Sequence, residues 1–378
     1  MSEGSRATAR VLLECNNGCV FCSQAGVTGG APFGEQLETA RRQGDEVTLV
    51  GGEPTLDPRL AEHVAAARRL GFVRVGLQTN GRRLAEAGYV AELARAGLTD
   101  VHLSIHGAES AAHDYHTGVA GSFDAALAGL AAARASSLTA VVNTVLTRSS
   151  FRSLAGMPKL LSQRGVAGWL VSVPRSAGRL SADFDRLMPR LGLAVPFALS
   201  ALAAGEKLGL DVGIAGAPRC LLGEYTRWAL DDGPHVDDPH GSHEAQGRLA
   251  PRAFAEACDG CPARAHCPGL DAAYLERFGG DELGPARTRM PATAARSTAR
   301  DSRIARMFVG PGELGPPATR TPSPNADKGQ KGKVALPLAG KVKPAVAEAT
   351  AGSPRRSGEA LKELFPGLFE GEPKSPPE

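Results

Sequence analysis

Aromatic residues, long hydrophobic runs and strong net charge are all scarce in this sequence. Aromatic side chains make up 5% of the 378 residues, and the formal net charge is +3. Such a charge is too small to indicate a nucleic-acid-binding protein. No stretch approaches the roughly 18 apolar residues of a membrane span, and the polar segment Met1–Arg10 lacks the apolar core of a secretory signal. We therefore expect a cytoplasmic protein with neither a membrane nor a nucleic acid as partner.

Cysteines are few, but they are grouped. The chain has seven, an odd number, and six of them fall in two short clusters. This pattern favours metal or cluster ligation in a reducing compartment over disulfides. The remaining composition, 42% hydrophobic and 22% charged, is ordinary for a globular protein, and the length allows roughly two domains.

Short apolar segments alternate with Ala-rich amphipathic segments from residue 7 to about residue 173. The predicted strands are Val11–Leu13, Val47–Val50, Val73–Leu77, Val101–Ile105, Val141–Leu146 and Leu170–Val173. The predicted helices are Glu35–Gln43, Arg59–Leu70, Leu84–Ala96, Phe123–Ala135 and Leu154–Arg164. Glycines expected to be C-caps follow four of these helices, at Gly44, Gly71, Gly97 and Gly165. The alternation predicts an α/β fold of parallel βαβ units, either an open doubly wound sheet or a partial TIM-like barrel.

Polar residues follow the predicted strands, and their positions favour the barrel. They include Gly51-Gly52-Glu53-Pro54, Gln78-Thr79-Asn80-Gly81, Ser104-Ile105-His106-Gly107, Asn143-Thr144 and Pro174-Arg175-Ser176. In a TIM-like barrel the loops after the strands converge on one face and form the active site. We therefore predict a partial (β/α)6 TIM-like barrel with one shared site. Asn143 inside an apolar strand needs a partner, and a ligand is a natural one, whereas His106 is also consistent with a loop histidine.

The first cysteine cluster follows the first predicted strand with the spacing C-x3-C-x2-C, at Cys15, Cys19 and Cys22. A cubane iron–sulfur cluster needs four thiolates when the protein supplies all its ligands. Three thiolates would leave one iron open to a substrate or cofactor. A zinc knuckle lacking one ligand and scattered buried cysteines are the alternatives.

The remaining four cysteines form a second group, Cys220, Cys258, Cys261 and Cys267, which is enough for a closed site. They follow predicted helices at Asp183–Leu191 and Pro196–Gly209 and an apolar run at Val212–Ala215, and a helix is predicted at Ala272–Phe278. Zinc bound by the same four thiolates is the alternative to a cluster. We interpret His235, His240 and His243 as residues of a solvent-exposed loop rather than as metal ligands.

Three regions result: residues 7–190 as the barrel, 191–285 as a small cysteine-bearing region, and 286–378 as a linker and tail. The Pro-rich composition after about Gly310 predicts disorder. Within it, Leu361–Phe369 has helically spaced apolar residues, which suggests a peptide that docks on a partner. An inert tail is the alternative.

The first cysteines and the glycines one strand later together resemble the radical S-adenosylmethionine (SAM) superfamily. Its signature C-x3-C-x-aromatic-C is matched by Cys15, Cys19, Phe21 and Cys22, and its Gly-Gly-Glu-Pro by Gly51–Pro54. The resemblance covers roughly residues 7–180. It implies a [4Fe-4S] cluster held by the three cysteines, with SAM chelating the open iron.

The resemblance also implies roles for residues at the strand ends. Gly51, Gly52 and Glu53 would hold the methionine ammonium, and Phe21 would lie near the adenine. Ser104 and Asn143 would contact the ribose or the carboxylate. A clear version of the strand-5 glycine/glutamate motif of some members is lacking. The implied reaction is one-electron cleavage of SAM to a 5′-deoxyadenosyl radical, which abstracts hydrogen from the substrate.

The second cysteine group resembles the SPASM and twitch extensions of this superfamily. The spacing of Cys258, Cys261 and Cys267 fits, although the pattern continues with a cysteine where this chain has Asp271. The resemblance implies one auxiliary [4Fe-4S] cluster, ligated by Cys220, Cys258, Cys261 and Cys267, with an electron-transfer or structural role.

Three functions remain open at this point. The first is a radical SAM enzyme acting on a peptide or protein side chain, with flavodoxin or ferredoxin as reductant. The short polar stretch before the first strand leaves no room for a leader-binding domain, so we expect a separate protein, recruited by the tail. The second is a small-molecule or nucleotide-derived substrate, as in molybdenum-cofactor synthesis. The third is a non-enzymatic iron–sulfur or zinc scaffold.

Overall fold

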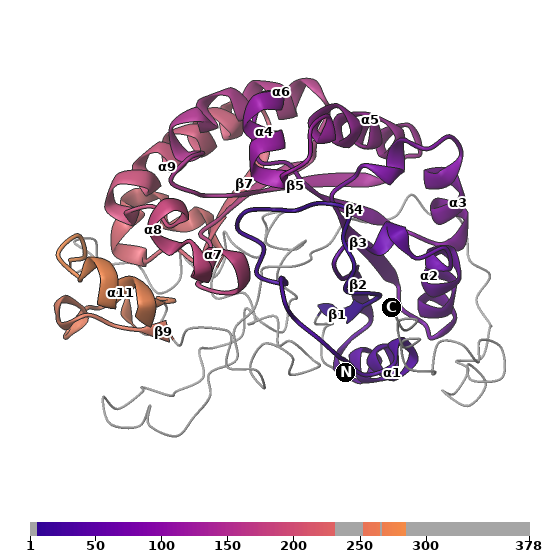
Figure 1. The fold of residues 1–378 in the computed structure, drawn as a ribbon, viewed down its shortest axis with the longest axis horizontal. Helices are drawn as coiled ribbons and strands as arrows, with labels where there is room; N and C mark the ends of the chain where they lie inside the picture. Colours follow the sequence, from indigo (N-terminus) through magenta and orange to yellow (C-terminus); the bar gives the residue numbers. More distant parts are fainter. Residues whose placement is uncertain (1–5, 231–251, 265–266, 285–378) are drawn as a thin grey trace, which may run out of the picture.

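The computed structural model describes residues 6–230, 252–264 and 267–284 (Figure 1). The three histidines between Cys220 and Cys258, and the tail with its Leu361–Phe369 segment, lie outside these residues. No helix of the described ranges is both long enough and apolar enough to span a membrane.

A parallel sheet of eight strands, hydrogen-bonded in chain order, forms the centre of the molecule. Its strands are β1 (Arg6–Arg10), β2 (Glu46–Val50), β3 (Arg74–Thr79), β4 (Asp100–Ser104), β5 (Thr139–Val145), β6 (Gly168–Ser172), β7 (Asp211–Ala215) and β8 (Ala229–Leu230). The α/β class and the parallel order are confirmed, but the predicted count of six strands is wrong. The run at Val212–Ala215 is part of β7. Strand β8 adds a two-residue pairing, which is too short to appear as a hydrophobic run in the sequence. The sheet thus continues past residue 190, and the division into three regions stays a prediction.

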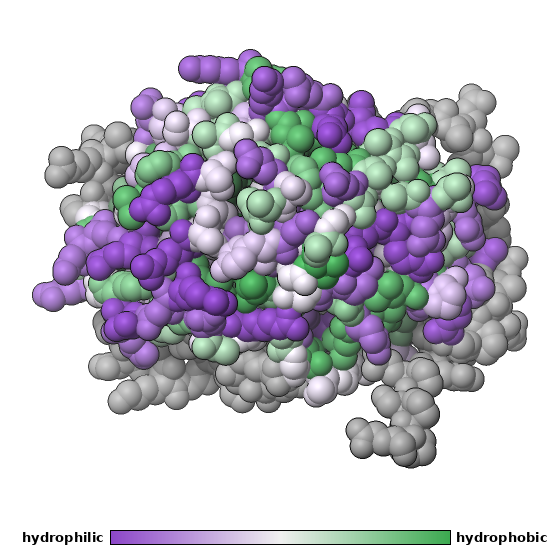
Figure 2. All heavy atoms as spheres, turned by 45° about the horizontal axis from the view of Figure 1, so that its top comes forward, coloured by the Kyte–Doolittle hydropathy of each residue, from purple (hydrophilic) through white to green (hydrophobic). Residues whose placement is uncertain are grey.

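Helices surround the outer side of this sheet in an arc (Figure 1). They are α1 (Phe33–Gln43), α2 (Leu60–Arg69), α3 (Tyr89–Ala96), α4 (Ser110–Thr117), α5 (Ser122–Ala135), α6 (Met157–Gln163), α7 (Gly178–Ala182), α8 (Phe184–Leu187) and α9 (Leu191–Lys207). On the face of the molecule shown in Figure 2, hydrophilic and hydrophobic side chains are intermixed. Leu193 and Phe197 of α9 are among the large hydrophobic residues exposed to solvent.

Several predicted boundaries are wrong for identifiable reasons. The first strand is Arg6–Arg10, not Val11–Leu13, because the backbone of this segment of alternating polar and small residues pairs with β2, and residues 7–10 are buried by the packing. Helix α9 begins at Leu191 and contains Pro196, whereas the prediction started the helix at the proline. Gly88, at φ +79°, separates α3 from a short 3-10 helix, so the predicted Leu84–Ala96 helix is divided.

The two faces of the strands carry different side chains, because successive residues of a strand point to opposite sides. Residues of one face join the hydrophobic core: Val47, Leu49, Val75, Leu77, Val101, Leu103, Ala140, Val142, Trp169 and Val171. The alternate positions are often polar, for example Gln78, Ser104, Asn143 and Ser172. The inner face of the sheet is therefore where a polar site can form.

A small C-terminal lobe follows the sheet. It contains the antiparallel ribbon of β9 (Arg252–Ala253) and β10 (Leu270–Asp271), followed by α11 (Ala272–Phe278). The hydroxyl of Tyr274 accepts a hydrogen bond from the Leu191 N–H (2.7 Å) and donates one to Glu282. The lobe is thereby fixed to the start of α9.

Candidate functional site

A cavity of about 190 Å³ opens at the carboxyl ends of the strands. Its lining includes all nine residues predicted for the first cluster and for SAM: Cys15, Cys19, Phe21, Cys22, Gly51, Gly52, Glu53, Ser104 and Asn143. Further lining residues come from the ends of β3 and β6 and from the C-terminal lobe, among them Gln78, Ser172, Arg175 and Arg252. Residues distant in sequence thus meet at one place, as the loop convergence of a parallel sheet predicts.

The loop that carries the three cysteines is held at both ends by backbone hydrogen bonds. On one side, the N–H groups of Gly52 and Glu53 donate to the carbonyls of Leu12 (2.9 Å) and Glu14 (2.8 Å). On the other side, Gly18 and Val20 donate to the carbonyls at the end of α4, at 2.7 and 3.0 Å. The positions of the cysteines are therefore set by the ends of β2 and α4, and α4 is a helix that the sequence pattern did not predict.

Gly51 and Gly52 are required by the close approach of this loop. A Cβ atom on Gly52 would lie 2.1 Å from the Glu14 carbonyl oxygen, and one on Gly51 would lie 2.4 Å from that of Leu12. Both distances are shorter than van der Waals contact, so any side chain here would displace the loop. The glycines are thus explained by packing, and their predicted contact with SAM stays a prediction.

The three thiols lie near one another; the residue Cys15 is exposed, whereas Cys19 and Cys22 are partly buried. Burial and the neighbouring Cys22 and Cys15 raise the pKa of Cys19 to about 12, and burial raises the pKa of Cys15. A thiolate at these positions therefore needs a nearby positive charge, which iron would supply. Three soft sulfur donors in one cavity wall fit a cubane that keeps one iron open. Within the described residues, no three His, Cys, Asp or Glu side chains lie close enough to bind a single metal ion.

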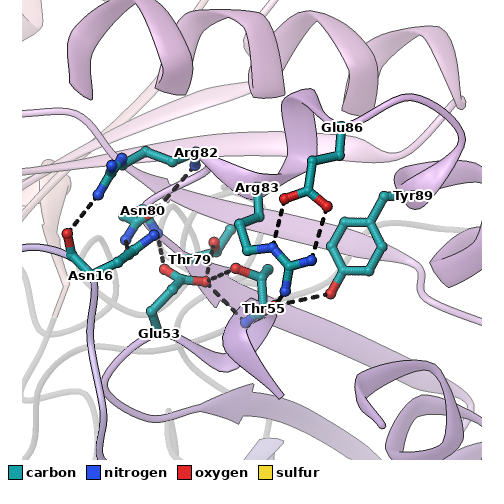
Figure 3. Close-up of polar contacts among 9 residues, drawn as sticks. All are labelled: Asn16, Glu53, Thr55, Thr79, Asn80, Arg82, Arg83, Glu86 and Tyr89. Atoms are coloured by element: carbon teal, nitrogen blue, oxygen red, sulfur yellow. Dashed lines mark hydrogen bonds and ion pairs between the residues drawn. The ribbon is translucent and has the colours of Figure 1, made fainter. Parts of the chain in front are cut away.

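Glu53 is the centre of a buried hydrogen-bond network that joins the ends of β2 and β3 (Figure 3). Oε1 accepts from the Thr55 N–H (3.1 Å) and from the hydroxyls of Thr55 (2.6 Å) and Thr79 (2.7 Å). Oε2 accepts from the Asn80 N–H at 2.6 Å. Burial raises the pKa of Glu53, while these four donors act to lower it. Every partner donates, which matches an ionised carboxylate.

This network extends to the cysteine loop. The Asn80 side chain donates to the Asn16 side-chain oxygen at 2.7 Å, and Arg82 donates to the Asn16 carbonyl at 2.5 Å. Glu53 therefore fixes the residue next to Cys15 through Asn80 (Figure 3). Thr79 belongs to the strand-end motif that predicted the shared site, whereas Thr55 had no sequence signal, because a Thr after a proline is compatible with an ordinary turn.

Phe21 and His106 also line the cavity, and their rings meet edge to face with centroids 4.7 Å apart. His106 is buried, and its Nδ1 accepts from the Val145 N–H at 3.3 Å. Burial lowers the pKa of His106 well below the usual value, so its ring is neutral near pH 7.

Asn143 accepts a hydrogen bond from the Ser172 hydroxyl at 2.6 Å, a partner within the protein that the sequence could not reveal.

A second cavity is lined by all four remaining cysteines, Cys220, Cys258, Cys261 and Cys267. Burial raises the pKa of Cys220, and the other three thiols raise it further, since negative charges close together oppose one another. Four thiols around one cavity match the number of ligands of a closed cluster, although, as for the other described residues, no three of them lie close enough to bind a single metal ion such as zinc.

Comparison with known proteins gives the first site a family. Residues 11–149 match the radical SAM superfamily. This match covers less than half of the chain and includes Cys15, Cys19, Cys22 and Gly51–Pro54, on which the expected resemblance rests. The resemblance to the superfamily is thereby confirmed for these residues, while the SPASM or twitch character of the C-terminal part stays a prediction.

Several characterised proteins resemble parts of the chain. It is 30% identical to an AdoMet-dependent heme synthase of Methanosarcina barkeri over 46% of this chain and 54% of that protein. It is 35% identical to a probable GTP 3′,8-cyclase of Methanopyrus kandleri over 38% of this chain and 48% of that protein. The chain thus spans about half the length of these two relatives.

Two further similarities extend over more of the chain. A PqqA peptide cyclase of Xanthomonas campestris is 28% identical over 76% of this chain and 90% of that protein. The crystal structure of Streptococcus suis SuiB bound to precursor peptide SuiA superposes with a TM-score of 0.47 at 16% identity, over 59% of this chain and 51% of that chain.

Proposed function

We propose that this protein is a radical SAM enzyme that modifies a peptide or protein side chain. The observation that carries the proposal is the single cavity lined by three cysteines together with the strand-end residues expected to bind SAM. The match of residues 11–149 to the radical SAM superfamily supports the same chemistry.

Cys15, Cys19 and Cys22 would hold a [4Fe-4S] cluster. When bound, this cluster supplies the electron that cleaves SAM to a 5′-deoxyadenosyl radical, which abstracts hydrogen from the substrate. The protein's own contribution is to orient SAM and to exclude water. Gly51, Gly52 and the Glu53 carboxylate are proposed to bind the methionine ammonium.

The remaining wall residues would position the other parts of SAM. Phe21 is proposed to lie near the adenine, and Ser104 and Asn143 near the ribose or the carboxylate. Both polar residues project from the inner face of the sheet into the cavity wall, which supports this assignment. The expected reductant is a flavodoxin or ferredoxin.

A peptide substrate is favoured by the extent of the similarity to the Xanthomonas peptide cyclase, which covers 76% of this chain. A nucleotide substrate is the second candidate, because the Methanopyrus GTP cyclase is 35% identical over a shorter region. The two are separable: under the peptide proposal, added GTP does not increase the formation of 5′-deoxyadenosine. An increase with GTP would favour the second candidate.

The four other cysteines are proposed to ligate an auxiliary [4Fe-4S] cluster. Because four thiolates complete its coordination, this cluster would transfer electrons or stabilise the lobe rather than bind substrate directly. Zinc is the competing occupant of the same donor set.

Anaerobic reconstitution followed by reduction with SAM tests the proposal. We expect 5′-deoxyadenosine and about eight irons per chain, from two cubanes. Cys19→Ala should abolish 5′-deoxyadenosine formation, whereas the matched variant Cys220→Ala should lower the iron content and leave the first cluster able to bind SAM. No 5′-deoxyadenosine from a protein with an intact first cluster would refute the radical mechanism. About four irons together with zinc would refute the auxiliary cluster.

A further inference from the structure

The β9–β10 ribbon separates the two cavities. Arg252 and Pro268 line the cavity at the strand ends, which we call the reaction cavity. The residues next to them in sequence, Ala253 and Gly269, line the four-cysteine cavity. The strands of the ribbon lie so close that a Cβ on Gly269 would be 2.6 Å from the Ala253 carbonyl oxygen. One thin element is therefore a wall of both sites.

Asp271, at the end of β10, connects this ribbon to the end of β6. Its Oδ1 lies 2.5 Å from Nε of Arg175, and its Oδ2 accepts the Ser176 N–H at 2.6 Å. Both members of the ion pair are buried, with 7% of Arg175 and 4% of Asp271 exposed. Arg175 itself lines the reaction cavity. The carboxylate thus holds both the guanidinium and the backbone of the loop after β6.

Attachment of the lobe does not by itself explain this ion pair. A buried ion pair contributes little net stability, because desolvation of the two charges offsets their attraction, and an apolar pair often serves equally well. The lobe also has a separate anchor through Tyr274 and Leu191, away from the reaction cavity. What the ion pair adds is a fixed direction for one planar guanidinium, which presents its N–H donors in a rigid fork.

We propose that Asp271 is a positioning residue that holds the Arg175 guanidinium in the wall of the reaction cavity, so that the four-cysteine lobe sets the geometry of SAM binding. This inference rests on the proposed radical SAM function for its kinetic consequence, but not for its structural one. Arg175 is then a ligand-contacting residue, and Asp271 acts through it.

The structural consequence is tested by hydrogen exchange on the full chain without cofactors. Asp271→Ala should increase exchange at residues 175–177 at least tenfold, because the Ser176 N–H loses its buried acceptor and each 1.4 kcal/mol of protection is a factor of ten. Tyr274→Phe, which alters only the other anchor, should leave exchange at those residues unchanged. Equal exchange in Asp271→Ala and the unaltered chain would overturn the inference, whether or not the protein cleaves SAM.

The kinetic consequence is tested on reconstituted protein by 5′-deoxyadenosine formation at varied SAM concentration. Asp271→Asn should raise the KM for SAM about tenfold, as expected for the loss of one charge-assisted contact. The double variant Arg175→Met/Asp271→Leu replaces the ion pair by apolar side chains, so we expect restored stability with the KM still raised. Restoration of both would show a merely structural pair and would overturn the inference. Absence of 5′-deoxyadenosine from the unaltered enzyme would instead count against the proposed function.

Discussion

Replacement of Glu53 by Gln should destabilise the protein before any ligand is considered. The Glu53 carboxylate accepts four hydrogen bonds, three at Oε1 and one at Oε2. The side-chain amide nitrogen of Gln cannot accept a hydrogen bond. It breaks fewest hydrogen bonds where it replaces Oε2, which accepts one, rather than Oε1, which accepts three. There it would face the Asn80 N–H, 2.6 Å away, donor against donor. One unsatisfied buried donor and the loss of charge assistance at the other bonds together cost about 2–3 kcal/mol.

Urea unfolding of the cofactor-free protein measures this cost, with an unchanged m-value as the sign that the two-state comparison holds. Glu86→Gln is a matched control, because Glu86 pairs with Arg83 at the surface (2.6 Å) and such pairs contribute at most about 1 kcal/mol. Equilibrium dialysis of SAM against the reconstituted protein provides the second readout. If Glu53→Gln unfolds at the same urea concentration as the unaltered protein, the network argument is wrong, whether or not the variant still binds SAM.

Two other perturbations test the loop and the buried histidines. Gly52→Ala should destabilise by about 1–3 kcal/mol through overpacking and lower the iron bound on reconstitution. Gly121→Ala is the control, because Gly121 has φ +78° and an added Cβ would have no atom within 4 Å. This variant should lose about 1–2 kcal/mol of stability through backbone strain and keep its iron content. Equal losses of iron in the two variants would contradict the close-approach argument. Burial lowers the pKa of His113 to about 4 from 6.5, so the unfolded chain takes up a proton first as the pH falls. Stability should therefore decrease between about pH 6.5 and 4, by about 1.4 kcal/mol per unit and roughly 3 kcal/mol in all for this residue. His113→Gln should show a shallower decrease in urea unfolding, and an identical slope would argue against His113 as its source.

The sequence predicts the parallel sheet best where large apolar residues recur at every second position. The runs at Val47–Val50 and Val101–Ile105 lie within one residue of β2 and β4, because Val47, Leu49, Val101 and Leu103 form the face that joins the hydrophobic core. The first strand was misplaced because Arg6–Arg10 contains only charged, polar and small residues and therefore shows no run of large apolar side chains. Its burial depends on partners such as Gln36, whose side chain accepts the Arg10 N–H at 2.5 Å. Such partners are set by tertiary structure and leave no periodic pattern.

The candidate site was predictable to a greater extent than the helices. Cys15, Gly52, Glu53 and Asn143 could be assigned to one place because the loops after parallel strands meet on one side of the sheet. The strand-end position of Arg175 was also predicted, but its ion pair with Asp271 and the contribution of Arg252 could not be assigned, since they depend on how a short ribbon far along the chain packs against the strand ends. A pairing as short as β9–β10 has no hydrophobic alternation to reveal it.

Backbone contacts, more than side-chain contacts, position the cysteine loop. Four of its carbonyl or N–H groups pair with the ends of β2 and α4, while the side chains of Leu12 and Leu13 are only partly buried. This pairing requires glycine where the two backbone segments approach closely, whereas most side chains along the loop take no part in it. Gly51, Gly52 and Glu53 therefore serve a common purpose: the glycines admit the loop, and the Glu53 carboxylate, through Asn80, fixes the residue next to Cys15. On this view the thiols are preorganised by the fold, and cluster assembly does not have to order the loop that holds it.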